Sequence, residues 1–248
     1  MKKIEIYVAT HKDYIFPDIE IYRPIHVGKA LSDLELNIQT DNSGENISYL
    51  NKNFCELTAL YWMWKNSDAE VLGLVHYRRY FSGSAALLQE HKIFNVADYQ
   101  EKQGVNVIVA KKVTFLKSIE KFWKFNKKNY FSNYEQFCLN HFSKDWDELG
   151  KTINTLYPEY VKSFEHISNS KMGLSLYNMF IADRAFVDGY CEWLFTILFA
   201  LKEKINIDDY DTYQARLYGF LSERLLNVYI YHHRKEINLS YQDVLMLE

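Results

Sequence analysis

Short apolar segments alternate with a longer amphipathic one along the first half of this chain of 248 residues. Residues 4–9 and 71–75 are compact apolar runs that predict buried strands, and residues 51–66 between them carry apolar side chains at helical spacing. Residues 105–110 repeat the strand pattern. The order strand, loop, helix, strand favours an α/β sheet with parallel neighbours.

The second half of the chain is richer in helical patterns. Residues 174–182 predict one further strand, and residues 185–204 and 211–231 predict two long helices. The chain shows no internal repeat and no low-complexity segment. These elements complete an α/β architecture with a helical carboxyl-terminal part.

Residues 111–130 predict a basic amphipathic helix with two different faces. One face is aromatic and aliphatic, and the other collects four lysines: Lys117, Lys121, Lys124 and Lys128. A basic amphipathic helix can lie on an anionic lipid surface. An ordinary packed helix with a solvated lysine face has the same pattern. The sequence therefore leaves both interpretations open.

Composition and charge exclude several classes of protein. With a net charge of −3 the chain as a whole is not a polyanion binder, so we expect no nucleic-acid partner. The three cysteines are far apart and have no metal-binding spacing, which suits a reduced, cytoplasmic protein. Glu5 interrupts the first apolar segment, unlike a signal peptide, and the apolar run at residues 193–201 is too short to span a bilayer.

The strand at residues 71–75 leads into an unusual cluster of side chains: His76, Tyr77, Arg78, Arg79 and Tyr80. Open α/β sheets bind ligands at the carboxyl ends of their strands. Paired guanidiniums there suit an anionic ligand, because each can grip a phosphate with two hydrogen bonds. The same arginines could instead be surface charges in ion pairs.

Several motifs follow one another along nearly the whole chain. They are Ala9-Thr10-His11-Lys12, Asp41-x-x-Gly44-x-Asn46-Ile47-Ser48, Asn53-x-Cys55-Glu56-Leu57-Thr58, Tyr61-Trp62-x-Trp64-Lys65-Asn66, Gly73-Leu74-x-His76-Tyr77-Arg78-Arg79-Tyr80-Phe81, Tyr177-Asn178-Met179-Phe180-Ile181 and Gly219-Phe220-Leu221-Ser222-Glu223-Arg224-Leu225. With these motifs the chain resembles a bacterial family of capsular-polysaccharide, exopolysaccharide and O-antigen gene clusters, long catalogued as a domain of unknown function.

The resemblance implies a glycosyltransferase with a GT-A-like fold, a single domain whose mixed, mostly parallel sheet is flanked by helices. Residues 1–110 would bind the nucleotide-sugar, and residues 111–248 would form the acceptor-side and helical part. The implied donor is a UDP-sugar carrying a hexose, with galactose or galactofuranose suspected, and the implied acceptor is a lipid-linked oligosaccharide. The resemblance also implies a cytoplasmic enzyme that could lie peripherally on the inner face of the membrane. The alternative is a non-catalytic module that binds a nucleotide-sugar or carbohydrate, because the arginine and aromatic cluster would serve either.

Most GT-A enzymes bind Mn²⁺ or Mg²⁺ through an Asp-x-Asp motif at the end of a central strand. Here that place is occupied by His76 to Arg79, without a carboxylate pair. We hypothesise that basic side chains stabilise the departing diphosphate, so that no metal cofactor is required. Asp41 or the acidic run at residues 208–211 could still reach a metal, although the run also suits a helix start.

The resemblance and the strand ends together give the candidate site residues. Donor binding is assigned to Thr10, His11, Lys12, Asp41, Asn46, Asn51, His76, Tyr77, Arg78, Arg79 and Tyr80. Acceptor binding is assigned to Tyr177, Asn178 and Met179. An inverting transferase needs a carboxylate base, for which Glu223 is the first candidate and Asp211 the second. Glu223 could equally be a structural partner of Arg216 or Arg224, Asn51 could be only a helix cap, and Glu56 could orient neighbouring loops.

Overall fold

The structure is a computed structural model that describes residues 2–86, 91–102, 104–122 and 125–247. Its main sheet has the strand order β11-β7-β10-β4-β1-β2-β3. In chain order these strands are β1 (Ile4–Thr10), β2 (Tyr22–His26), β3 (Gln39–Thr40), β4 (Val71–His76), β7 (Val107–Ala110), β10 (Phe180–Asp183) and β11 (Leu239–Gln242).

Parallel pairing dominates the main sheet and brings the carboxyl ends of neighbouring strands to one edge. Strands β4, β1, β2 and β3 pair in parallel, as do β11 and β7, whereas β10 runs antiparallel to both β4 and β7. Ala9 is opposite His76, so β1 and β4 end at the same edge. Since β10 runs the other way, the residues before Phe180 enter the sheet at that edge.

Three further strands branch from the end of β4. They are β5 (Arg79–Ala86), β6 (Lys92–Ile93) and β12 (Val244–Met246). Strand β5 pairs antiparallel with β4, β6 and β12, and its contact with β4 is the pair His76 and Arg79. The chain therefore turns back sharply at Tyr77 and Arg78, which holds both residues at the edge of the sheet.

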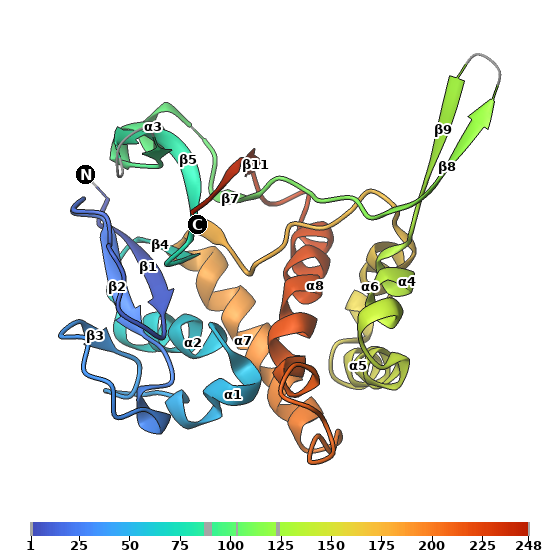
Figure 1. The fold of residues 1–248 in the computed structure, drawn as a ribbon, viewed down its shortest axis with the longest axis horizontal. Coiled ribbons are helices and arrows are strands. Elements are labelled where there is room, and N and C mark those ends of the chain that lie inside the picture. The colour runs from blue at the N-terminus through green and yellow to red at the C-terminus, as the bar shows by residue number, and fades with distance from the viewer. Residues whose placement is uncertain (1, 87–90, 103, 123–124, 248) are drawn as a thin grey trace.

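The helices are α1 (Asn51–Phe54), α2 (Leu57–Asn66), α3 (Val96–Glu101), α4 (Asn133–Asn140), α5 (Ser143–Leu156), α6 (Val161–Asn169), α7 (Arg184–Lys202) and α8 (Leu217–His232). All of the helices except α3, which lies beside β5, form the lower part of the molecule (Figure 1). Short 3₁₀ turns occur at η1 (Lys29–Leu31), η2 (Ser48–Leu50), η3 (Pro158–Tyr160) and η4 (Gln214–Arg216). Among the described residues, no helix is long and apolar enough to cross a bilayer.

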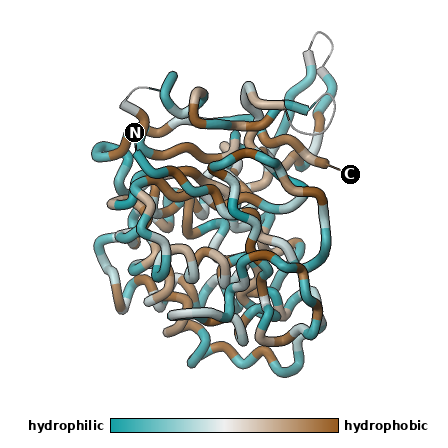
Figure 2. The backbone as a smooth tube through the Cα atoms, turned by 90° about the vertical axis from the view of Figure 1, so that its left-hand side faces the viewer, coloured by the Kyte–Doolittle hydropathy of each residue, from teal (hydrophilic) through white to brown (hydrophobic). Residues whose placement is uncertain are grey.

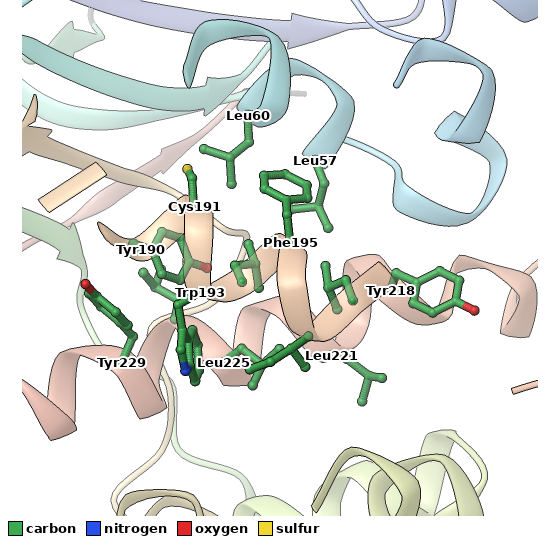
Figure 3. Close-up of a cluster of buried hydrophobic side chains, with 14 of the residues drawn as sticks. Leu57, Leu60, Tyr190, Cys191, Trp193, Phe195, Tyr218, Leu221, Leu225 and Tyr229 are labelled. Carbon is green, nitrogen blue, oxygen red and sulfur yellow. The ribbon is translucent and has the colours of Figure 1, made fainter. Parts of the chain in front are cut away.

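The largest core lies where α2, α7 and α8 pack together (Figure 3). Leu57 and Leu60 of α2 meet Tyr190 and Phe195 of α7, and α8 adds Leu221 among others. The central strands β4 and β7 are apolar on both faces, as buried strands require: all residues of β7 and the first five of β4 are buried. Hydrophobic segments accordingly run through the inside of the fold, and hydrophilic ones dominate its turns (Figure 2).

Two predicted elements differ in extent from their observed counterparts. The helix predicted at residues 51–66 is interrupted at Cys55, whose φ of 52° and ψ of −130° are incompatible with helix continuation. The strand predicted at residues 174–182 is shorter, because Tyr177 and Asn178 adopt left-handed φ values of 72° and 52° before β10 begins. Both irregularities bring side chains to the edge where β1 and β4 end.

The helix predicted within residues 111–130 is wrong: this segment forms an antiparallel hairpin of β8 (Leu116–Phe122) and β9 (Phe125–Tyr130). Its aromatic and β-branched residues favour strands, and cross-strand pairing overrides the helical spacing of the lysines. The hairpin extends away from the body as an arm (Figure 1). Lys121 and Lys128 are exposed on it, Lys117 pairs with Glu135 at 3.1 Å, and Lys124 lies outside the described residues.

Candidate functional site

A cavity of about 620 Å³ lies at the carboxyl edge of β1 and β4. Its charged lining consists of the cations Lys52, Arg78, Arg79 and Arg216 and the carboxylates Glu56 and Glu223. Aromatic and imidazole rings complete much of the wall: His11, His76, Tyr77, Tyr177 and Phe220. These residues come from β1, the end of β4, the start of α2, the approach to β10 and α8, so the fold assembles the cavity from distant parts of the chain.

The structure brings many of the predicted residues to this cavity. Those that line it are His11, Asn51, His76, Tyr77, Arg78, Arg79, Tyr177 and Glu223. Three charged lining residues were not assigned to the site from the sequence: Lys52, Glu56 and Arg216. Glu56 belongs to one of the motifs that carry the family resemblance, and Arg216 lies shortly before another. This proximity to the motifs is the sequence signal that could have identified them.

The arginines after β4 are held by rings rather than by carboxylates. The Arg79 guanidinium lies 4.8 Å from the centre of the Tyr177 ring, and that of Arg78 lies 5.2 Å from the Tyr77 ring. Lys12 approaches Tyr77 as well, at 5.2 Å. Within the part of the chain that the structure describes, neither arginine makes an ion pair. Both charges are therefore available to an anionic ligand, since cation–π contacts leave N–H donors free.

His76 links β4 to the segment that leads into β10. Its Nε2 lies 2.6 Å from the carbonyl oxygen of Tyr177, which can only accept, so Nε2 carries the proton of this hydrogen bond. Burial lowers the pKa of His76 and outweighs the opposing effect of the Glu56 charge. The imidazole is thus neutral at neutral pH, and its Nδ1 keeps a lone pair.

Glu223 fixes the same segment from the other side. Its Oε1 accepts a hydrogen bond from the Tyr177 main-chain N–H at 2.8 Å, and its Oε2 accepts one from Arg224 Nη1 at 2.8 Å. Burial raises the pKa of Glu223, against the attraction of the Arg224 guanidinium. Both carboxylate oxygens therefore have protein partners.

Glu56 is the second carboxylate of the cavity. It stands directly before α2, and its Oε1 accepts a hydrogen bond from Asn178 Nδ2 at 2.7 Å. The same nitrogen lies 3.3 Å from the Gly219 carbonyl oxygen. Asn178 is itself buried and does not line the cavity. It is connected to the cavity through its hydrogen bond to Glu56.

Several predicted donor-binding residues do not reach the cavity. Asp41 is fully buried and accepts hydrogen bonds from the main-chain N–H of Gly28 and Lys29 and from the Ser48 hydroxyl. Thr10 and Asn46 make local hydrogen bonds: Thr10 donates to the Lys12 carbonyl, and Asn46 bridges Gly44 and Ser48. These side chains shape the loops behind the cavity. Lys12 is exposed beside Tyr77 and is not part of the cavity lining.

Three more predicted residues also lie off the cavity. Tyr80 and Met179 are fully buried in the core on the β5 side of the sheet. Asp211 is exposed and accepts a hydrogen bond from the Gln214 main-chain N–H at 2.7 Å. Asp211 therefore makes a local hydrogen bond in the loop before η4 and does not reach the cavity.

No group of three histidine, cysteine, aspartate or glutamate side chains in the described residues is arranged to hold a metal ion. Neither Asp41 nor the aspartates at residues 208–211 contribute to such a group.

The fold and its edge cavity define an α/β protein of the GT-A-like class, which confirms the fold class predicted from the sequence. The structure is similar to that of WbbM, a bifunctional glycosyltransferase solved in its apo form, with a TM-score of 0.85 and 26% sequence identity. The match covers 99% of this chain and 45% of that one, so this chain spans slightly less than half the length of WbbM.

The chain belongs to the family described as "Domain of unknown function (DUF4422)", which matches residues 5–235. No curated protein matches it. The predicted resemblance to a family of unknown function is confirmed at this level.

Proposed function

We propose that this chain is a glycosyltransferase module that moves a hexose from a UDP-sugar to a lipid-linked oligosaccharide during surface-polysaccharide assembly. Galactose and galactofuranose are the hexoses we propose. The observation that carries the proposal is a cavity lined both by the guanidiniums of Arg78, Arg79 and Arg216 and by the carboxylates of Glu56 and Glu223. Similarity to a bifunctional glycosyltransferase supports it.

The arginines suit the donor half of the reaction. As the bond to the sugar breaks, negative charge accumulates on the diphosphate, and fixed cations in a partly enclosed site stabilise that charge. Arg78 and Arg79 come from the turn after β4, and Arg216 enters from the start of α8. We propose that these three side chains meet the diphosphate and that the reaction requires no divalent metal.

The acceptor half needs a group that takes the proton of the attacking hydroxyl. From the sequence, Glu223 was the first candidate for this group and Asp211 the second; Glu223 lines the cavity and Asp211 does not. Tyr177, Asn178 and Met179 remain the predicted acceptor-side segment, of which Tyr177 lines the cavity. Donor-side contacts of His11, Asn51, His76 and Tyr77 are proposed on the same ground.

A membrane-facing role belongs to the hairpin of β8 and β9. Lys121 and Lys128 are exposed on it, together with Ile119, whose side chain is 49% exposed. Ile119 and Lys128 are cross-strand partners and so share one face. Cationic and apolar groups on one face suit an anionic lipid surface. We propose a cytoplasmic protein that touches the inner face of the membrane through this arm.

Incubating the protein with a panel of nucleotide-sugars and a lipid-linked acceptor tests the proposal. We expect release of UDP from UDP-galactose or UDP-galactofuranose, unchanged by a chelator. Activity that is lost with chelator and restored by Mn²⁺ would disprove metal independence. Binding of a UDP-sugar without any release of UDP would favour the alternative, a non-catalytic binding module.

A further inference from the structure

Glu56 differs from Glu223 in how its oxygens are used. Asn178 donates to Oε1 of Glu56, and within the described ranges Oε2 has no hydrogen-bond partner. Glu223 has a protein donor on each oxygen. A carboxylate that receives a proton from a substrate hydroxyl needs a free oxygen that faces the ligand. Of the two cavity carboxylates, Glu56 meets this requirement.

Asn178 is built to hold Glu56 in place. Its side chain is almost fully buried, and its amide nitrogen is fixed between two acceptors, the Glu56 carboxylate and the Gly219 carbonyl. Tyr177 and Asn178 are consecutive non-glycine residues with left-handed φ values, a conformation that L-residues adopt at a cost in backbone strain. Glu223 and His76 restrain this strained segment through the main chain of Tyr177.

We propose that Glu56, oriented by Asn178, is the base that deprotonates the acceptor hydroxyl, an assignment that rests on the transferase function proposed above. The acceptor oxygen forms a bond to the anomeric carbon while the bond from that carbon to the diphosphate oxygen breaks. The hydroxyl proton passes to Oε2 of Glu56. The electron pair of the broken bond stays on the diphosphate, beside Arg78, Arg79 and Arg216.

Two consequences follow from this assignment. A base that assists direct displacement gives a product with inverted anomeric configuration. Glu223 becomes a positioning residue, which acts through Tyr177 and does not exchange a proton with the acceptor.

The Glu56→Gln variant separates the chemical role from the structural one. Glutamine keeps a carbonyl oxygen that can accept from Asn178 Nδ2, but it cannot take a proton. We expect kcat for transfer to fall by about 10²–10⁴-fold, with the UDP affinity and the thermal midpoint close to those of the unchanged protein. The matched control is Glu192→Gln on the exposed face of α7, which should transfer at the normal rate.

The pH profile distinguishes the two carboxylates. Wild-type activity should fall on the acid side as the base becomes protonated, and Glu56→Gln should lose this pH dependence. The Glu223→Gln variant should keep the acid-side pH dependence, even if its activity is lower, because Glu56 is intact in it. Asn178→Ala should lower kcat less than Glu56→Gln does, since the carboxylate is present but no longer held.

Three results would overturn the assignment. They are normal transfer by Glu56→Gln, a product with retained configuration, or loss of the acid limb in Glu223→Gln instead. In each of these the wild-type protein still transfers sugar, so the proposed function would survive. A wild-type protein that binds UDP-sugars and releases no UDP removes both the function and the assignment.

Discussion

Replacing Asp41 with asparagine should destabilise the protein without changing its affinity for UDP. The side chain of Asp41 is 0% exposed. Its Oδ2 accepts from the Gly28 N–H at 2.7 Å, and its Oδ1 accepts from the Lys29 N–H at 3.1 Å and from the Ser48 hydroxyl. The carboxylate thus joins the loop after β2 to η2, behind the cavity.

The expected size of the effect follows from these contacts. Asparagine can keep its oxygen toward Lys29 and Ser48, but its Nδ2 then faces the Gly28 N–H, so that two donors meet. A hydrogen bond to a charged group contributes about 1.5–3 kcal/mol, and a buried unsatisfied donor costs about 1–3 kcal/mol. We expect the free energy of unfolding to fall by about 3 kcal/mol.

Urea unfolding followed by fluorescence measures this loss. With a slope near 3 kcal/mol/M, the midpoint should fall by about 1 M. Asp33→Asn, an exposed change in the same loop region, should leave it unchanged. UDP affinity, measured by calorimetry on folded protein, should match the wild type. Normal stability with weakened UDP binding would refute the reasoning and assign Asp41 to the donor, as the sequence suggested.

Burial lowers the pKa of His26 and His76, so the unfolded chain takes up protons before the folded protein does as the pH falls below about 6.5. The thermal midpoint should therefore drop between pH 7.5 and 5. A midpoint that stays level or rises would contradict this. Gly28→Ala should lower the free energy of unfolding in urea by about 1–2 kcal/mol more than Gly104→Ala does. Both glycines have a positive φ, but only at Gly28 would a Cβ lie 2.5 Å from Asn51 Oδ1. Equal losses in the two variants would show that this contact relaxes freely. Replacing both Lys121 and Lys128 with glutamate should weaken co-sedimentation with anionic vesicles at least 10-fold. The same double change at Lys162 and Lys171, in and after α6, should not weaken it. Equal vesicle binding by the two double variants would show that the hairpin does not make the membrane contact.

The elements that the sequence predicts correctly are those dominated by a single pattern. Strands β1, β4 and β7 are short apolar runs buried on both faces, and α7 and α8 are long apolar-rich helices. Their order also implies that β1 and β4 end at one edge, so the sequence could predict that His11, His76 and Arg79 lie close together.

Elements set by tertiary contacts are not visible in local patterns. Helical spacing of lysines did not reveal the β8 and β9 hairpin, because pairing with a partner strand outweighs such spacing. The break at Cys55 brings Glu56 to Asn178, a contact across 122 positions, and Arg216 reaches Cys55 across 161 positions. A buried structural aspartate and a ligand-binding one also look alike in sequence, as Asp41 illustrates.

Calorimetric titration with UDP, in the absence of divalent metal, tests most directly whether the cavity binds the nucleotide donor. We expect Arg79→Ala to weaken UDP binding by about 10- to 100-fold, since a charge-assisted hydrogen bond contributes about 1.5–3 kcal/mol, while its thermal midpoint changes little. Arg234→Ala, an exposed change beyond the far end of α8, should bind UDP as the wild type does. Equal UDP affinity in all three proteins, or no binding to any of them, would contradict the account.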